Sequence, residues 1–198
     1  MYRLFVGLRL ADHTRALLES MRSGLPGAKW VDVEDTHITL RFIGEVDGGA
    51  AEDLHAALSR IRAPSFALAL ASVDCFASSG KVHTVFVGVD KEPWLAHLRE
   101  KVESAVVRTG FPPERRKFRP HVTLARFKTG AGDRLGSYLH RYSQFRAEPF
   151  EVGQFTLFRS HLTAKGAHYE TVAEYDLEKG RRLLSPGLDG APASAFEP

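Results

Sequence analysis

A short segment that occurs twice constrains the fold of this chain more than any other feature of its sequence. Residues 36–42 are Thr-His-Ile-Thr-Leu-Arg-Phe, and residues 120–127 are Pro-His-Val-Thr-Leu-Ala-Arg-Phe, with one extra residue in the second copy. Each copy follows a segment of helical pattern and precedes another, so the similarity extends to the order of the elements. Self-similarity of this kind indicates repeated structural units and predicts two lobes related by a pseudo-twofold axis.

The spacing of apolar residues around both copies predicts strands mixed with helices. Strict alternation of apolar and polar residues indicates a half-buried strand, whereas spacings of three and four residues indicate an amphipathic helix. The predicted strands are residues 4–10, 36–44, 66–76, 82–89, 119–127, 150–158 and 167–177, and the predicted helices are residues 14–21, 50–61, 94–107 and 133–142. We therefore expect an α+β fold of two lobes, in which two antiparallel sheets line a central cleft and the helices pack on the outside.

Length and composition are typical of one globular unit. Of the 198 residues, 43% are hydrophobic and 26% are charged, which argues against extensive disorder and against a fibrous protein. We expect one two-lobed domain over residues 1–180. Residues 181–198 contain Pro186, Gly187, Gly190 and Pro192 and show little periodicity, which predicts a flexible C-terminal tail.

Cysteine content and hydropathy limit the cellular context. Cys75 is the only cysteine, so an intramolecular disulfide or a cysteine-rich metal site is excluded. No apolar run approaches the roughly 20 residues that span a bilayer, and the first residues have the pattern of a strand rather than of a signal peptide. We expect a cytoplasmic protein with no membrane contact.

Positive charge is concentrated around the second copy of the repeat. The net charge is only +3, but residues 115–128 place six cations and two aromatic side chains around His121. A basic cluster of this kind favours an anionic partner, although a solvated basic surface is an equally simple interpretation until the histidine is considered.

The two motifs and their flanks resemble a known family. The segment from Arg3 to Leu8, the residues from Trp30 to Val46, and the stretch from Phe158 to Tyr169 extend the likeness over residues 2–178. The chain resembles the two-histidine phosphoesterase superfamily and, within it, the RNA 2′,3′-cyclic phosphodiesterases, also called the 2′-5′ RNA ligase family. This resemblance implies that His37 donates a proton to the leaving 3′ oxygen and that His121 accepts one from water. The product would carry a 2′-phosphate, and the reverse reaction would form a 2′-5′ linkage without ATP.

The residue types suit this chemistry on their own terms. Side chains two apart in a strand share a face, so His37 with Thr39 and His121 with Thr123 each present an imidazole beside a hydroxyl. Two imidazoles with ordinary pKa values near 6.5 can provide one base and one acid around a phosphate at neutral pH. The threonine hydroxyls can donate to the phosphate oxygens. Because the two motifs are nearly symmetric, the residues alone do not distinguish acid from base.

Three further residues are candidates for substrate contacts. Arg126 matches a position where the family has a cation for the substrate phosphate, and a surface salt bridge is the alternative. Strict alternation from His121 would turn Arg126 to the opposite face, so contact with the phosphate requires a bulge, a strand end or a long reach. Phe42 and Phe127 could stack on a base, although phenylalanine after an apolar run more often belongs to the core.

Other catalytic chemistries lack their motifs. No His-x-His or His-Glu-x-x-His pattern occurs, so we expect no metal site, and without a phosphate-binding loop for ATP we expect no cofactor. Neither Ser160 nor Cys75 has the surroundings of a nucleophile. His161 with Thr163 forms a third His-x-Thr, but a turn follows it, and we interpret it as a chance match that leaves a substrate contact open.

The expected partner is RNA with a 2′,3′-cyclic phosphate end, transfer-RNA halves being one candidate, and the expected state is a monomer. Two alternatives remain open from the sequence. One is a phosphodiesterase of the same superfamily that acts on a small cyclic nucleotide or on ADP-ribose cyclic phosphate. The other is a non-catalytic RNA-binding module. The basic run around His121 favours a polymer, because several phosphate contacts strengthen binding to a chain.

Overall fold

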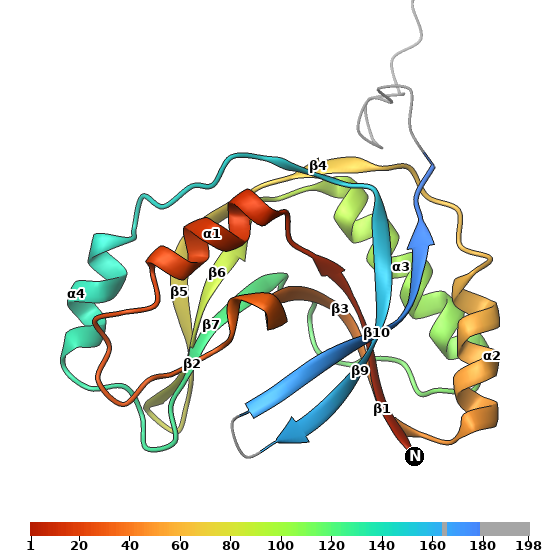
Figure 1. Ribbon diagram of the computed structural model, residues 1–198, viewed down its shortest axis with the longest axis horizontal. Coiled ribbons are helices and arrows are strands. Elements are labelled where there is room, and N and C mark those ends of the chain that lie inside the picture. The colour runs from red at the N-terminus through yellow and green to blue at the C-terminus, as the bar shows by residue number, and fades with distance from the viewer. Residues whose placement is uncertain (164–165, 179–198) are drawn as a thin grey trace, which may run out of the picture.

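The computed structural model describes residues 1–163 and 166–178 (Figure 1). The tail predicted for residues 181–198 lies outside the described residues. Within the described part, the helices are α1 (Asp12–Ser20), α2 (Gly48–Leu58), α3 (Pro93–Arg108) and α4 (Arg134–Arg141), with one 3₁₀ turn, η1 (Val33–Asp35). The strands are β1 (Tyr2–Arg9), β2 (Lys29–Trp30), β3 (His37–Val46), β4 (Phe66–Leu68), β5 (Leu70–Ser78), β6 (Lys81–Val89), β7 (His121–Arg126), β8 (Phe150–Val152), β9 (Gln154–Thr163) and β10 (Gly166–Asp176).

The main sheet consists of two antiparallel halves that meet at one point. Its strand order is β10-β9-β1-β3-β7-β6-β5, and β2 pairs with the far end of β7. The two motif strands, β3 and β7, are neighbours in the centre, and the pair Ile38–Val122 joins them. The expected α+β class is confirmed, and the two predicted sheets are present as halves of one sheet with this narrow seam.

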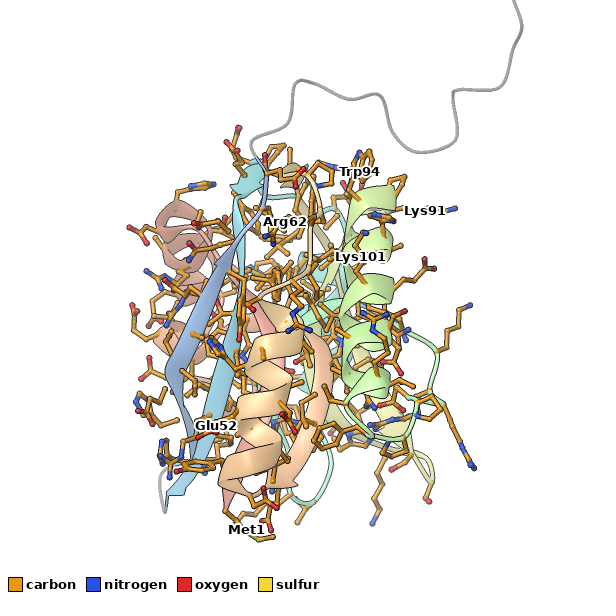
Figure 2. All side chains as sticks on the ribbon, turned by 90° about the vertical axis from the view of Figure 1, so that its right-hand side faces the viewer. Met1, Glu52, Arg62, Lys91, Trp94 and Lys101 are labelled. Carbon is orange, nitrogen blue, oxygen red and sulfur yellow. The ribbon has the colours of Figure 1, made fainter. Side chains whose placement is uncertain are left out.

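Two of the helices, α1 and α3, each lie beside the half of the sheet that does not contain the strand preceding them. Helix α1 follows β1, and α4 follows β7, and both lie with β5, β6 and β7 at the left of Figure 1. The Tyr138 hydroxyl on α4 donates to the main-chain oxygen of Met21 at the end of α1, 2.8 Å away. Helices α2 and α3 contact each other, and α3 contacts β3 in the opposite half. Figure 2 shows these two helices side by side, with Glu52 on α2 and Lys101 on α3.

Two of the predicted strands were wrong in extent, because each is divided between two sheets. Residues 66–76 form β4 and β5, and residues 150–158 belong to β8 and β9. Strand β4 pairs with β8 in a separate two-stranded ribbon, and only Ala69 and Gly153 separate these strands from β5 and β9. A one-residue break leaves the apolar pattern unchanged, so the pattern gives no sign that the hydrogen-bonding partner has changed.

Apolar side chains from both halves form one core. The side chains of Ile38 and Val122 at the seam are fully buried, and so are Leu54 and Leu58 on α2 and Leu98 on α3. Burial of the alternate strand residues turns the polar side chains of β3 and β7 to the opposite face, where they meet above the seam.

Candidate active site

The two motif histidines begin the two central strands and are held in the same way. His37 Nδ1 donates to the main-chain oxygen of Asp35 over 2.8 Å, and His121 Nδ1 donates to that of Arg119 over 2.7 Å. A carbonyl oxygen only accepts, so the hydrogen lies on Nδ1 in both neutral rings. Each Nε2 is therefore the nitrogen that exchanges a proton with a bound molecule.

The seam brings both histidines and both threonines together. In the antiparallel register set by Ile38 and Val122, His37 lies beside Thr123 and Thr39 lies beside His121. All four are partly exposed, whereas the residues between them are buried, so the four share one face of the sheet. Diagonal neighbours across two such strands lie about 7–8 Å apart, with a somewhat smaller separation between their Cβ atoms, which leaves room for one phosphate between the imidazoles.

Aromatic rings support both imidazoles from behind. The His37 ring lies 4.7 Å from the ring of Phe5 and 4.8 Å from that of Tyr169, measured between centroids. The His121 ring lies 4.9 Å from the ring of Phe76 and 5.1 Å from that of Phe86. These contacts restrict the rotation of each imidazole, so the hydrogen bond at Nδ1 and the packing together fix the direction of Nε2.

Burial makes both imidazoles weak bases. Loss of solvent lowers the pKa of His37 from 6.5 to about 4, although its bond to the Asp35 carbonyl acts in the opposite direction. Loss of solvent also lowers the pKa of His121, and its bond to the Arg119 carbonyl again opposes the shift. The charge of Arg126 lowers both pKa values, and the charge of His121 contributes to the lowering at His37. The two rings and the guanidinium are thus within electrostatic reach of one another.

A β-bulge turns Arg126 toward the histidines. Across from β7, Phe86 pairs with Thr123 and Val85 with Ala125, so Leu124 is an extra residue without a partner. The bulge shifts the alternation by one residue and places Arg126 on the face of His121, as the sequence analysis required for a phosphate contact. Arg126 also lines the pocket beside His37.

The first motif strand contains the equivalent bulge. On β1, Gly7 pairs with Thr39 and Val6 with Arg41, which leaves Leu40 as the extra residue of β3. The two copies therefore correspond without the insertion that the sequence comparison placed in the second one, and Phe42 occupies the position of Arg126. Phe42 is 39% exposed and lines the same pocket as His37.

A pocket of about 760 Å³ opens on the His37 side of the seam. His37, Thr39, Arg126 and Phe42 line it, whereas His121 and Thr123 lie outside its wall. Further cations and aromatic side chains complete the lining, and the sequence analysis gave them no role: Arg3, Arg22, Lys29, Trp30, His168 and Tyr169. Four of them, Arg3, Trp30, His168 and Tyr169, lie in the segments that carried the family resemblance, which was the available signal.

The remaining candidates lie away from this pocket. Phe127 is 7% exposed and belongs to the core, so its ring has little surface for a base. His161 Nε2 is 2.7 Å from the Glu170 carboxylate within the β9–β10 hairpin. In the basic run, Arg116 pairs with Glu114 and Arg119 with Asp74, so part of that charge is neutralised within the protein.

The described part of the chain offers no site for a metal ion and no helix for a membrane. Residues 1–163 and 166–178 contain no group of three or more His, Cys, Asp or Glu side chains placed to hold a metal ion. No helix in that part of the chain combines the length and apolar character needed to cross a bilayer.

The fold and the site together define a phosphoesterase of the two-histidine class, with one His-x-Thr motif on each of two paired strands. Residues 10–164 match the sequence model of the family described as the 2'-5' RNA ligase superfamily. The chain belongs to this superfamily, and the family predicted from the two motifs is thereby confirmed.

Curated relatives cover most of the chain. An RNA 2′,3′-cyclic phosphodiesterase of Aeropyrum pernix is 37% identical over 164 residues, which are 81% of this chain and 92% of that protein. An RNA 2′,3′-cyclic phosphodiesterase of Bacillus subtilis is 32% identical over 158 residues, covering 75% of this chain and 80% of its own length.

Solved structures share the fold over nearly the whole described chain. E. coli LigT in its apo form superposes with a TM-score of 0.74 at 25% identity and covers 90% of this chain and 98% of its own. The complex of E. coli LigT with 3′-AMP has a TM-score of 0.71 at 25% identity, with coverage of 89% and 98%.

Proposed function

We propose that this protein hydrolyses the 2′,3′-cyclic phosphate end of RNA to a 2′-phosphate. The observation that carries the proposal is the pair of imidazoles, each fixed through Nδ1, that flank one seam in a basic cleft. The names of the Aeropyrum and Bacillus relatives support this substrate, and the complex of LigT with 3′-AMP supports a nucleotide ligand.

In the proposed reaction, a water molecule attacks phosphorus opposite the bond to the ribose 3′ oxygen. His121 Nε2 removes the proton from the water as the new P–O bond forms. The P–O3′ bond breaks, and His37 Nε2 delivers its proton to the 3′ oxygen. Water has then been added across one P–O bond, His37 is neutral, and His121 carries the proton that solvent exchange returns.

Binding of the phosphate is coupled to protonation of His37 in this scheme. In the free protein the pKa of His37 is about 4, so the ring is neutral at pH 7. An anionic phosphate beside the ring favours the charged form and raises its pKa. The acid is therefore formed when substrate binds, and the pH profile of turnover is expected to be bell-shaped.

Thr39, Thr123 and Arg126 stabilise the phosphate. The two hydroxyls donate to its non-bridging oxygens, where charge accumulates during the displacement, and the Arg126 guanidinium supplies a compensating charge. The side chains are set in place by the alternation of the strands and by the bulge at Leu124.

The pocket beside His37 holds the terminal nucleotide. Phe42, Trp30 and Tyr169 offer aromatic surfaces for the base, and Lys29 and Arg22 offer charges for the phosphate of the preceding nucleotide. An RNA end therefore fits this site better than a small cyclic nucleotide does. The reverse reaction, with a 5′ hydroxyl as nucleophile, would join transfer-RNA halves or similar ends through a 2′-5′ linkage, and we place both reactions in the cytoplasm with the protein as a monomer.

The test compares His37→Ala and His121→Ala with the unchanged protein. Turnover of an oligonucleotide with a 2′,3′-cyclic phosphate end should fall by a factor of at least about 10² in each variant, while the oligonucleotide still binds. Retained turnover in either variant would exclude the two-histidine mechanism. A preference for the cyclic mononucleotide at every salt concentration would exclude RNA as the substrate, because a polymer makes more phosphate contacts.

A further inference from the structure

The residue two positions before each motif histidine occupies the same place in both copies. Asp35 and Arg119 each accept the Nδ1 hydrogen of their histidine through the main-chain oxygen, at 2.8 and 2.7 Å. Their side chains, however, carry opposite charges. The two halves of the site are therefore equal in backbone geometry and unequal in electrostatics.

The Asp35 carboxylate is held close to the His37 side of the cleft. It is 11% exposed, and it accepts the backbone N–H of Tyr169 over 3.0 Å and faces His168 Nδ1 at 3.2 Å. Tyr169 in turn packs edge-on against the His37 ring. The carboxylate thus has a fixed position and little contact with solvent, so its charge acts on His37 with little screening.

The Arg119 guanidinium lies close to His121 in a more solvated setting. Its side chain is 54% exposed, and it pairs with Asp74 at 2.6 Å. The guanidinium carbon lies 5.1 Å from the ring centre of Phe76 and 4.9 Å from that of Phe86, the two rings that support His121. Solvent and Asp74 both weaken its effect.

The other charged groups around the two rings do not separate them in this way. Arg126 on β7 lowers the pKa of both histidines, and the charge of His121 also lowers the pKa of His37 across the seam. Only the charges at the preceding positions differ in sign: Asp35 raises the pKa of His37, and Arg119 lowers the pKa of His121. Further titratable and cationic groups face His37 from the pocket wall: Arg3 on β1, Arg22 and Lys29 before and on β2, Asp32 before η1, and His168 and Tyr169 on β10.

We propose that Asp35 and Arg119 are positioning residues whose opposite charges bias the two histidines in opposite directions, so that His37 holds the proton to be donated and His121 stays free to accept one. The inference rests on the proposed function and adds to it the physical reason for the direction of proton transfer. Each turnover moves one proton from water to His121 and one from His37 to the 3′ oxygen. The charges of Asp35 and Arg119 favour this direction, and they act with the bound phosphate against the burial of His37, which lowers its pKa in the free protein.

The variants Asp35→Asn and Arg119→Gln test the proposal without removing either main-chain carbonyl. Titration of the histidine ring resonances by NMR, with a nucleoside 2′-monophosphate bound, should show a lower pKa for His37 in Asp35→Asn. It should show a higher pKa for His121 in Arg119→Gln. The shift in Asp35→Asn should be the larger, at roughly one pH unit, because the Asp35 carboxylate is less exposed.

The pH profile of kcat, which reports the ionising groups in the substrate complex, distinguishes this role from a structural one. Asp35→Asn should lose about tenfold at pH 7.5, and the loss should shrink as pH falls, because acidic solution protonates His37 without help. Arg119→Gln should lose about two- to threefold, and that loss should shrink as pH rises, because alkaline solution keeps His121 neutral. Damage to the fold would not give opposite pH trends.

Two further variants serve as controls for this test. Glu34→Gln removes a neighbouring carboxylate that is 69% exposed and pairs with Arg15, and it should leave both profiles unchanged. Asp74→Asn frees the Arg119 charge and should move the pKa of His121 in the direction opposite to Arg119→Gln.

The same fractional loss at every pH in Asp35→Asn and Arg119→Gln would overturn the proposal and leave both residues as backbone supports. Failure of the proposed function would appear differently, as turnover that persists in His37→Ala or His121→Ala.

Discussion

At the scale of single residues, the burial of His37 links catalysis to stability. The ring is neutral in the folded protein down to about pH 4, whereas an exposed histidine of the unfolded chain takes up a proton near pH 6.5. Between these values the unfolded chain binds more protons than the folded one, so acid favours unfolding. Stability from this residue is complete above pH 6.5 and is lost progressively below it.

We expect the variant His37→Gln to lose part of this pH dependence. In the unchanged protein, the free energy of unfolding should fall between pH 6.5 and about 4 by on the order of 3 kcal/mol because of His37, in addition to the effect of other groups. Urea unfolding of both proteins at pH 7.5 and 4.5 measures the difference. If the free energy of unfolding changes equally between the two pH values in both proteins, His37 titrates with its ordinary pKa in the folded state.

At the scale of secondary structure, the close approach of β1 to β3 positions the first motif. A Cβ atom added at Gly7 would lie 2.8 Å from the main-chain oxygen of Ile38, which is closer than such atoms come in proteins. Gly7 pairs with Thr39 beside the bulge at Leu40. Any side chain at this position therefore pushes β3 away from β1 and displaces His37 and Thr39 together.

The variant Gly7→Ala should be destabilised by about 1–3 kcal/mol, because backbone atoms have to shift. Its kcat should also fall, because the first motif moves. The matched control is Gly48→Ala at the start of α2, where no atom lies within 4 Å of the added carbon, and where a small gain in stability of about 0.5 kcal/mol is expected. Thermal unfolding and steady-state kinetics of both variants test these expectations. Equal melting temperatures for Gly7→Ala and Gly48→Ala would contradict the steric argument.

Most elements of this fold could be predicted from the sequence, because their apolar spacing is determined locally. The strand that opens the chain, the two motif strands and the four helices appear where the patterns place them, within a few residues. The divisions at Ala69 and Gly153 could not be predicted, since a change of partner strand leaves no mark on the pattern. The bulge at Leu124 was required by the chemistry of Arg126, but its position depends on the register against β6.

The site residues likewise fall into those that could be predicted from local pattern and those that could not. His37, Thr39, His121 and Thr123 stand in strands with a repeated motif, so their common face followed from alternation and symmetry. Residues such as Lys29 and Arg22 come from the segment between α1 and η1, and only the tertiary fold brings them to the pocket.

At the scale of the whole molecule, a buried ion pair ties the first motif strand to the segment that leads into the second. Arg41 on β3 is 9% exposed on its side chain and lies 2.9 Å from the Glu103 carboxylate on α3. It also faces Glu114 at 3.6 Å and donates to the main-chain oxygen of Pro112. The guanidinium thus connects β3 with α3 and with the segment that follows α3.

Replacement of Arg41 by Met should lower the free energy of unfolding by about 3 kcal/mol, because the Glu103 carboxylate then keeps one cationic partner, Arg99 at 3.5 Å, and the backbone N–H of Glu114 at 2.8 Å. The double variant with Glu103→Gln should recover part of this loss, since the Glu103 side chain then carries no charge. Chemical denaturation of the single and double variants measures the coupling. If the double variant is less stable than Arg41→Met alone, the two side chains do not act as a pair.

The placement of α1 and α3 beside the opposite halves determines whether one copy of the repeat can fold as a separate fragment. The two halves have similar motifs, but their helices are not separate. Helix α1 precedes the first motif and lies with the strands of the second half, and α3 precedes the second motif and contacts β3 of the first half. A gene fragment that encodes a single copy of the repeat would therefore lose one of the helices beside its sheet and would leave its own first helix without the strands on which that helix packs.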